Sequence, residues 1–299
     1  AMNMDWTKDK KGNAGSDGGV NNPDFFAEQK KKILAQIQAR LNRDRSYNLC
    51  SITGNPKVGK TGLVLDSRTE EEVKEGKKIL ILDFDNGAEP TWDSAWDRDD
   101  NIVIFSPIEV RTDGSTDWEE TFNNANSFCQ YAKDLIKTGD VKSFCLDGVD
   151  KAFEGSSDVL RELLVKQQTK EGSIVHATDS VRVSTLDWKI RNRIYNRLLD
   201  LVCSLECDRF LITHMKPVYD NINVPTPIGE VPDWHKSTPA RFVQMIHIEK
   251  VMKGKTTNYV AKLTASKTNP SLVGQEWTIF TTNGDNKWFG IPELREGKL

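Results

Sequence analysis

LCSITGNPKVGKTG, residues 49–62, is the stretch that decides the fold of this chain of 299 residues. A short apolar run, predicted as a strand over residues 48–53, leads into glycines, and a helical pattern begins at Lys60. Glycine lets the backbone curl so that N–H groups point inward at an anion, and the N-terminus of the following helix adds partial positive charge. The stretch therefore predicts a phosphate-binding loop between a strand and a helix.

The same loop predicts the chemistry of its ligand. Lys60 would reach the β and γ phosphates of a nucleotide, and the Thr61 hydroxyl would ligate Mg²⁺. We therefore expect ATP and Mg²⁺ as cofactors. The residues expected to bind the nucleotide are Gly54, Asn55, Pro56, Lys57, Val58, Gly59, Lys60, Thr61 and Gly62.

Two further apolar runs end in acidic residues. The run at 143–147 ends in Asp147, and a carboxylate at the carboxyl end of a strand can hold Mg²⁺ through water. The run at 78–83 ends in Asp83, with Asp85 two residues later, and a carboxylate near the γ-phosphate can orient the attacking water. We prefer Asp85 as the catalytic carboxylate because it lies further out along the strand, with Asp83 as the alternative.

A polar end also follows the predicted strand at 209–213, where His214 comes directly after the apolar run. A side chain in this position would reach the same edge of the sheet, sense the γ-phosphate and couple hydrolysis to the segment that follows. A histidine with a purely structural role, in the core or on the surface, is the alternative.

Apolar runs of strand length alternate with helical patterns at 60–74, 118–137 and 187–206, which indicates crossover connections. The expected fold class is α/β, with a mostly parallel central sheet, helices on both faces, and antiparallel strands added at the C-terminal end. Two stretches, 152–185 and 215–240, show no clear pattern. Loops of that length in a compact domain are usually functional or disordered.

The chain divides into three parts by composition. Residues 1–22 are rich in Gly, Asn and Asp and lack hydrophobic periodicity, which predicts a mobile tail. Residues 23–46 contain one helical pattern that begins at a proline. Residues 47–299 then form a single α/β domain.

Charge and hydropathy exclude some classes of protein. The 41 basic and 44 acidic residues give a net charge of -3, so contact with nucleic acid requires a local basic patch. No apolar run approaches the roughly 18 to 20 residues of a membrane span, and the first twenty residues do not resemble a signal peptide. We expect no membrane partner and a cytoplasmic location, in the host cytoplasm if the protein is viral.

The order of these motifs over residues 48–282 resembles that of the RecA-like recombinase ATPases. The resemblance implies a RecA-like P-loop core that hydrolyses Mg²⁺-ATP at the interface between subunits of a homo-oligomer, in a ring or a filament. It places Asp85 where the family has a catalytic glutamate, and His214 where the family has a polar switch residue that is usually glutamine. Lys267 falls in a turn between late antiparallel strands, where the family lends a cationic finger to the neighbouring subunit's ATP.

The chain also looks like the short RecA-like proteins of phages and archaeal viruses, which promote strand annealing or exchange. This likeness implies binding of single-stranded DNA, with a single-strand-binding protein or another recombination protein as a partner. The family's two DNA-binding loops follow the strands that end at Asp147 and His214, which matches the two stretches without a pattern. Phosphate neutralisation and aromatic stacking would supply affinity there. The expected DNA contacts are Lys166, Lys170, Arg182, Trp234, Lys236 and Arg241.

Other functions fit the same core. A RecA-like regulatory or signalling ATPase would use it to switch protein partners, and a ring helicase would use it as a motor on DNA. The acidic net charge favours the regulatory reading slightly. A small-molecule kinase fits less well, because such enzymes usually have an Arg-rich lid and residues 215–240 contain almost no arginine.

Overall fold

In a computed structural model the chain forms two compact units, Ala1–Ser46 and Tyr47–Leu299. The predicted tail, residues 1–22, lies outside the described residues. The structure describes residues 23–43, 45–170, 181–220, 225–282 and 287–299.

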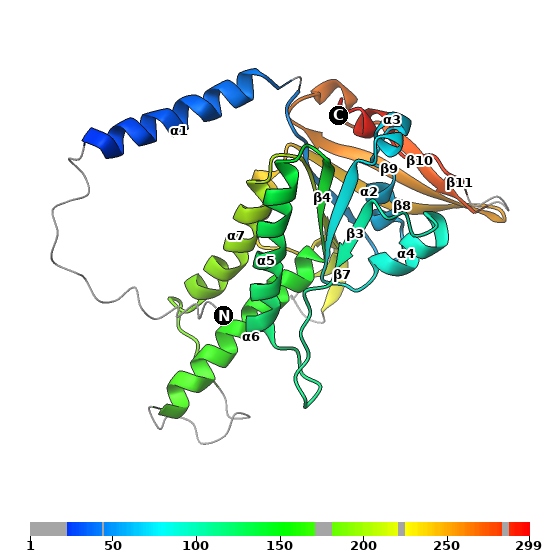
Figure 1. Cartoon of the computed structure of the whole chain (residues 1–299). Helices are drawn as coiled ribbons and strands as arrows, with labels where there is room; N and C mark the ends of the chain where they lie inside the picture. Colours follow the sequence, from blue (N-terminus) through cyan, green and yellow to red (C-terminus); the bar gives the residue numbers. More distant parts are fainter. Residues whose placement is uncertain (1–22, 44, 171–180, 221–224, 283–286) are drawn as a thin grey trace. The chain divides into compact units, whose positions relative to one another are not determined.

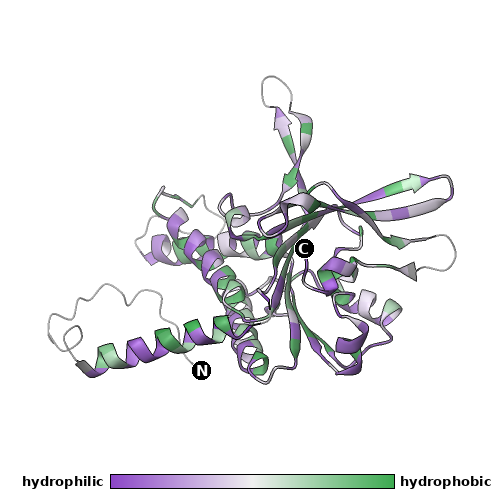
Figure 2. Ribbon diagram, turned by 90° about the horizontal axis from the view of Figure 1, so that it is seen from above, coloured by the Kyte–Doolittle hydropathy of each residue, from purple (hydrophilic) through white to green (hydrophobic). Residues whose placement is uncertain are grey.

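The first unit contains one described helix, α1 (Pro23–Leu41). Hydrophobic and hydrophilic residues alternate along its ribbon (Figure 2). Several of its large apolar side chains are exposed, including Phe26, Ile33, Leu34 and Leu41.

A nine-stranded sheet forms the centre of the second unit, and six of its strands run parallel to one another. Their order in the sheet is β8-β1-β5-β4-β2-β3, so strands distant in sequence lie side by side, as crossover connections require. The prediction of an α/β fold with a mostly parallel sheet is confirmed. The parallel strands are β1 (Leu49–Gly54), β2 (Lys78–Asp83), β3 (Ile102–Phe105), β4 (Val141–Asp147), β5 (Asp208–Thr213) and β8 (Gln244–Lys253).

Antiparallel strands extend the sheet beyond β8, as the sequence predicted. They are β9 (Thr256–Ser266), β10 (Glu276–Thr281) and β11 (Lys287–Trp288), with the 3-10 turn η3 (Pro270–Leu272) between β9 and β10. One detail differs from the expectation, because β8 itself pairs in parallel with β1 and only its other edge pairs antiparallel.

Helices cover both faces of the sheet (Figure 1). On one face lie α5 (Trp118–Ile136), α6 (Val149–Lys170) and α7 (Trp188–Cys203); on the other lie α2 (Lys60–Leu65), α3 (Glu70–Lys74), α4 (Ala88–Ala95) and α8 (Pro292–Arg295). Successive residues of the strands point to opposite faces. Leu80 and Leu82 therefore join the core under α5 and α7, whereas Ile79 and Ile81 join the core under α2 and α4.

The first stretch without a sequence pattern begins as a long helix, and its residues 171–180 lie outside the described residues. Gly155 explains part of the missing signal in α6. A Cβ atom at Gly155 would lie 2.2 Å from the Trp118 ring, so this helix packs against α5 through a residue of low helix propensity. The polar middle of α6 further weakened the apolar periodicity that sequence analysis relies on.

The second stretch forms a separate two-stranded sheet of β6 (Met215–Asp220) and β7 (Thr226–Pro232), followed by the 3-10 turn η2 (Thr238–Arg241). This hairpin projects from the main body (Figure 2). Both strands contain proline, which is tolerated because a two-stranded sheet has only edge strands, where a missing N–H leaves no ladder bond unmade.

The predicted helix over 60–74 is broken into α2 and α3. Asp66 ends α2 and pairs with Arg295, which also donates to the Asp66 carbonyl oxygen at 3.0 Å. Thr69 then starts α3 with a capping box, in which Thr69 and Glu72 satisfy each other's backbone N–H groups. The break therefore coincides with a long-range contact to Arg295 and with a local capping box.

Candidate active site

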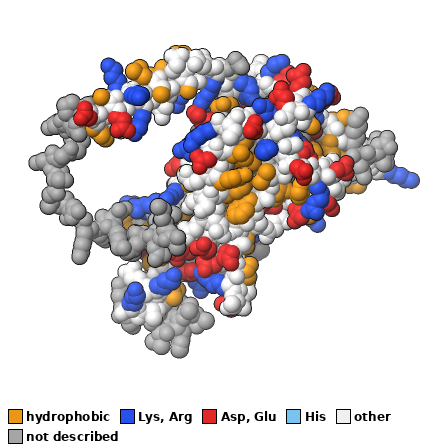
Figure 3. All heavy atoms as spheres, viewed as in Figure 1, with side chains coloured by type: hydrophobic (Ala, Val, Ile, Leu, Met, Phe, Trp, Pro, Cys, Tyr) orange, Lys and Arg blue, Asp and Glu red, His pale blue; other side chains and the backbone are white. Residues whose placement is uncertain are grey.

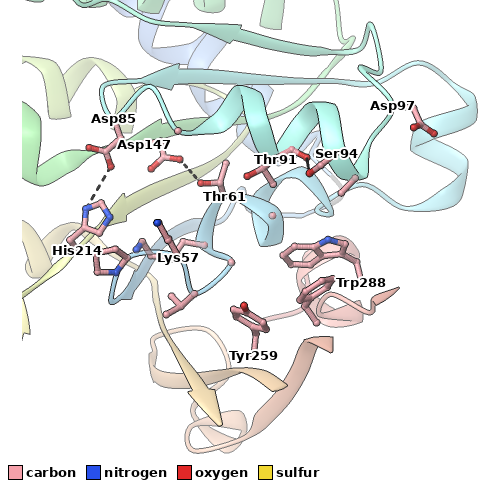
Figure 4. Close-up of a pocket in the computed structure, with 18 residues that line it drawn as sticks. Lys57, Thr61, Asp85, Thr91, Ser94, Asp97, Asp147, His214, Tyr259 and Trp288 are labelled. Atoms are coloured by element: carbon pink, nitrogen blue, oxygen red, sulfur yellow. Dashed lines mark hydrogen bonds and ion pairs between the residues drawn. The ribbon is translucent and has the colours of Figure 1, made fainter. Parts of the chain in front are cut away.

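The predicted site residues of the nucleotide centre lie at the carboxyl ends of the parallel strands. In the register of the sheet, Asp83 of β2 is paired with Asp147 of β4, and Thr53 of β1 is paired with Thr213 of β5. A pocket of about 1060 Å³ opens at this edge (Figure 4). Ligands of open α/β sheets bind in this place, because the loops that follow the strands diverge there.

The loop between β1 and α2 has the backbone that an anion cradle requires. Lys57 and Gly59 have φ angles of 61° and 88°, in the left-handed region. Gly54 has a φ of 152°, and a Cβ atom there would lie 2.5 Å from the Ile248 carbonyl oxygen, so only glycine fits. Loop residues Pro56, Lys57, Val58, Gly59, Lys60, Thr61 and Gly62 all line the pocket. Gly54 and Asn55 contribute carbonyl groups that accept hydrogen bonds from Lys60.

Lys60 lies at the start of α2 with a buried side chain. Its Nζ donates to the carbonyl oxygens of Gly54 at 3.0 Å and Asn55 at 2.9 Å, so the ammonium group is held inside the loop. Burial lowers the pKa of Lys60, and the negative charges of Asp147, Asp150 and Asp85 oppose this shift. The group is therefore a buried cation in the lining of the pocket.

Thr61 and Asp147 form the second contact expected of a Mg²⁺-nucleotide site. Thr61 Oγ1 donates to Asp147 Oδ2 at 2.7 Å (Figure 4). Burial raises the pKa of Asp147 to about 7; the Thr61 hydrogen bond opposes the shift, and the charges of Asp83 and Asp85 add to it. The positive charge of Lys60 compensates this buried carboxylate only in part, and oxygen ligands of this kind are those that Mg²⁺ prefers. The residues present thus fit a divalent cation.

Asp83 is the last residue of β2 and Asp85 follows two residues later, but their side chains have different surroundings. Asp83 is buried and accepts backbone N–H bonds from Asp85 at 3.1 Å and Ala88 at 2.8 Å, so it fixes the turn into α4. Asp85 lines the pocket. Gly148, directly after β4, packs closely against Asp85, because a Cβ atom at Gly148 would lie 3.2 Å from Asp85 Oδ1. This geometry favours Asp85 over Asp83 as the carboxylate available to a reacting water.

His214 also lines the pocket, and its imidazole lies between two carboxylates. Its Nδ1 is 3.1 Å from Asp150 Oδ2 and 3.6 Å from Asp85 Oδ2. The hydrogen bond to Asp150 raises the pKa of His214, against the effects of burial and of Lys60. Burial raises the pKa of Asp85, and Asp150 adds to the shift through its negative charge. Asp150 lies outside the motifs identified in the sequence, because its proximity to His214 depends on the pairing of β4 with β5.

An aromatic wall on the opposite side of the pocket was missed by the sequence reasoning. It consists of Tyr259, Phe280 and Trp288 from the antiparallel strands. The Phe280 and Trp288 ring centroids are 4.6 Å apart, and a Cβ atom at Gly62 would lie 2.1 Å from the Trp288 ring. No sequence motif could have placed these rings beside the phosphate loop, because the contact depends on the antiparallel pairing of β9, β10 and β11.

The predicted DNA contacts do not share one environment. Lys166 lies 3.8 Å from Glu119, in a region over α5 and α6 where acidic and basic side chains lie side by side (Figure 3). Arg241 donates to Asp200 at 2.5 Å and to Asn196 at 3.1 Å. Lys170, Arg182 and Lys236 are exposed. Gln168 bonds both the N–H and the carbonyl of Arg182, which brings Arg182 to the end of α6 near Lys170.

Trp234 corrects the prediction of an exposed stacking residue. Its side chain is 8% exposed and belongs to the core under α5 and α7, with its ring centroid 5.4 Å from that of Phe242. The large apolar area of the indole favours burial over solvent exposure. In this conformation Trp234 cannot stack on a base.

Lys267 lies directly after β9, away from the pocket lining, and its Nζ donates to the Ala240 carbonyl oxygen at 3.3 Å. Its role toward a neighbouring subunit stays a prediction. Among the residues that the structure describes, no helix has the length and apolar character to cross a membrane.

No protein-family model and no curated protein matches the chain. Among solved structures, a crystal structure of the RadB recombinase matches with a TM-score of 0.40 and 12% identity, over 81% of this chain and 92% of that one. A KaiC-like protein from the hyperthermophilic archaeon Pyrococcus horikoshii matches with a TM-score of 0.41 and 9% identity, over 77% of this chain and 84% of that one. Likeness at this level concerns the fold alone, so the function has to be argued from the side chains of the site.

Proposed function

We propose that this protein is a RecA-like ATPase that hydrolyses Mg²⁺-ATP and binds single-stranded DNA as a homo-oligomer, in a ring or a filament, to promote strand annealing or exchange. The observation that carries the ATPase part is the convergence of Lys60, Thr61 and Asp147 on one pocket edge. A buried ammonium group, a hydroxyl and a buried carboxylate form a set that matches phosphate and a divalent cation.

Each pocket residue has a distinct role in this proposal. Lys60 and the loop N–H groups hold phosphate, Thr61 and Asp147 hold the metal and its water, and Asp85 orients the attacking water. Mg²⁺ supplies charge neutralisation on the phosphates when it is bound. Trp288 and Tyr259 offer apolar surface for the nucleotide base. His214 couples the state of the pocket to the β6–β7 hairpin, and Lys267 serves the ATP of a neighbouring copy.

The DNA part has weaker support from the side chains. Lys170, Arg182 and Lys236 are exposed and lie in or near the segments after β4 and β5. The paired state of Arg241 and Lys166, together with the burial of Trp234, favours a second candidate function. In that candidate the same ATPase switches between protein partners.

Steady-state ATP hydrolysis with Mg²⁺, with and without single-stranded DNA, tests the proposal. Lys60→Ala should lower turnover by at least about 100-fold, because it removes a preorganised cation from the phosphate site. The matched control is Lys137→Ala, which removes an exposed lysine paired with Asp134 on α5 and should leave turnover unchanged.

The outcomes separate the two parts of the proposal. Turnover that DNA stimulates, and that Lys60→Ala abolishes, supports the recombination ATPase. Turnover lost in Lys60→Ala but indifferent to DNA supports the partner-switching ATPase. Full turnover in Lys60→Ala contradicts the ATPase itself.

A further inference from the structure

We propose that Asp150 is a positioning residue that holds His214 toward Asp85 and connects the nucleotide pocket to the β6–β7 hairpin. The inference rests on the proposed ATPase function, for which His214 and Asp85 face the pocket. Asp150 lies in the first turn of α6, three residues after Asp147, and does not line the pocket itself. It therefore acts through its neighbours.

The carboxylate of Asp150 makes three contacts with the end of β5. Asp150 Oδ2 is 3.1 Å from His214 Nδ1, and Asp150 Oδ1 is 3.4 Å from the His214 backbone N and 3.3 Å from Thr213 Oγ1. An ionised carboxylate only accepts hydrogen bonds, so the proton of the imidazole must lie on Nδ1. Asp150 thereby fixes both the tautomer and the ring orientation of His214, as carboxylates do for histidines in other sites.

Charged groups around the imidazole favour its protonated form. Asp150 and Asp85 face His214 from α6 and from the end of β2, while Lys60 faces it from α2 with the opposite effect. Asp85 in turn faces Asp150, Asp83 and Lys151. Burial opposes ionisation of Asp150, but its hydrogen bond to His214 and the positive charge there hold its pKa below the usual value. The contact between Asp150 and His214 thus raises the pKa of the imidazole and lowers that of the carboxyl.

Thr213 connects this pair to the hairpin. Its hydroxyl has one proton and two acceptors, the Asp233 carbonyl oxygen at 2.8 Å and Asp150 Oδ1 at 3.3 Å. Asp233, just after β7, also donates its N–H to the His214 carbonyl oxygen at 2.9 Å and pairs with Lys216 of β6 at 2.7 Å. A shift of His214 toward the pocket would redistribute these bonds, so the base of the hairpin senses the pocket through Asp150.

The test is the pKa of His214, read by NMR titration of the imidazole in the full chain, together with the pH profile of ATP turnover. Asp150→Asn keeps the size of the side chain but removes its charge, so the pKa of His214 should fall toward its ordinary value. The limb of the pH profile that reports His214 should move to lower pH by the same amount, and turnover near neutral pH should fall about tenfold or more. ATP binding should persist, because Lys60, Thr61 and Asp147 are unchanged.

Two variants complete the design. Glu154→Gln removes an exposed carboxylate one turn further along α6, where it pairs with Lys151, and should leave the pKa of His214 unchanged. Asp150→Glu keeps the charge, so the pKa of His214 should stay raised while turnover falls because the carboxylate is displaced. This variant also tests the role of the charge if Asp150→Asn fails to fold.

The result that overturns the inference is a pKa of His214 and a pH profile that are the same in Asp150→Asn and the wild type. The titration requires no ATP turnover. A wild-type protein that hydrolyses no ATP would therefore refute the proposed function while leaving the contact between Asp150 and His214 testable.

Discussion

The carboxyl edge of the parallel strands and the segments expected to contact DNA differ in how the chain holds their side chains. Lys60, Asp147 and His214 each follow a buried strand or open a helix, and they converge on one pocket. Trp234 and Arg241 lie after the hairpin, where one is packed in the core and the other is paired with Asp200. Sheet geometry determines position in the first region, whereas local packing decides it in the second.

Among the substitutions that test this difference between the two regions, Trp234→Ala should lower the free energy of unfolding most. Trp234→Ala should lower the free energy of unfolding by about 3–5 kcal/mol, because it empties a core site against Phe242. Chemical denaturation measures this change. Wild-type stability with a selective loss of DNA affinity would contradict the buried position and restore Trp234 as a stacking residue.

Substitution of Asp147 tests whether the buried carboxylate of the proposed metal site lowers the free energy of unfolding. Because its folded pKa is raised from about 3.9 to about 7, the unfolded state holds fewer protons between these values, and stability falls as pH rises through them. Asp147→Asn removes this cost, which at about 1.4 kcal/mol per pKa unit is about 4 kcal/mol at pH 8. The melting temperature without Mg²⁺ should therefore rise by about 8–16 °C at pH 8.

The comparison at low pH controls this experiment. At pH 4 the wild-type carboxyl is protonated in the folded state, so the two proteins should melt within a degree or two of each other. A variant that melts below the wild type at pH 8 would mean that ionised Asp147 stabilises the fold.

The smallest expected effects concern Lys236 and Arg241. These two residues of the expected DNA-contact segments should respond differently to substitution. If Lys236 contacts a phosphate, Lys236→Ala should reduce the slope of log affinity against log salt by about 0.7 for single-stranded DNA, with stability changed by less than about 0.5 kcal/mol. Arg241→Gln should change the slope less, because Asp200 and Asn196 already hold its guanidinium group. Equal slopes for the wild type and Lys236→Ala would remove Lys236 from the DNA surface.

The sheet could be predicted because each parallel strand is a short apolar run that ends in a polar residue, as at Asp83 and Asp147. Helix α6 could not be predicted, because Gly155 and a polar middle interrupt its apolar periodicity. The packing of Gly155 against Trp118 stabilises this helix instead. The β6–β7 hairpin could not be predicted either, because its prolines are not typical of strands. They are tolerated here since both strands are edge strands.

The candidate site was predictable where one motif contains several of its residues. The phosphate loop is continuous in sequence, so Lys60 and Thr61 could be named at once. Asp150 and Trp288 could not, because their proximity to His214 and Gly62 depends on strand pairing and on the return of the antiparallel strands. Long-range contacts of this kind leave no spacing to read in a single sequence.

The central claim is that Lys60, Thr61 and Asp147 form a Mg²⁺-nucleotide site, and calorimetric titration with ATP tests it most directly. The wild type and Lys137→Ala should bind ATP with equal affinity in Mg²⁺, and chelation of the metal should weaken binding. Lys60→Ala should weaken it by at least about tenfold, which is about 1.4 kcal/mol. Equal affinity for ATP in the wild type and Lys60→Ala, with or without Mg²⁺, would contradict the account.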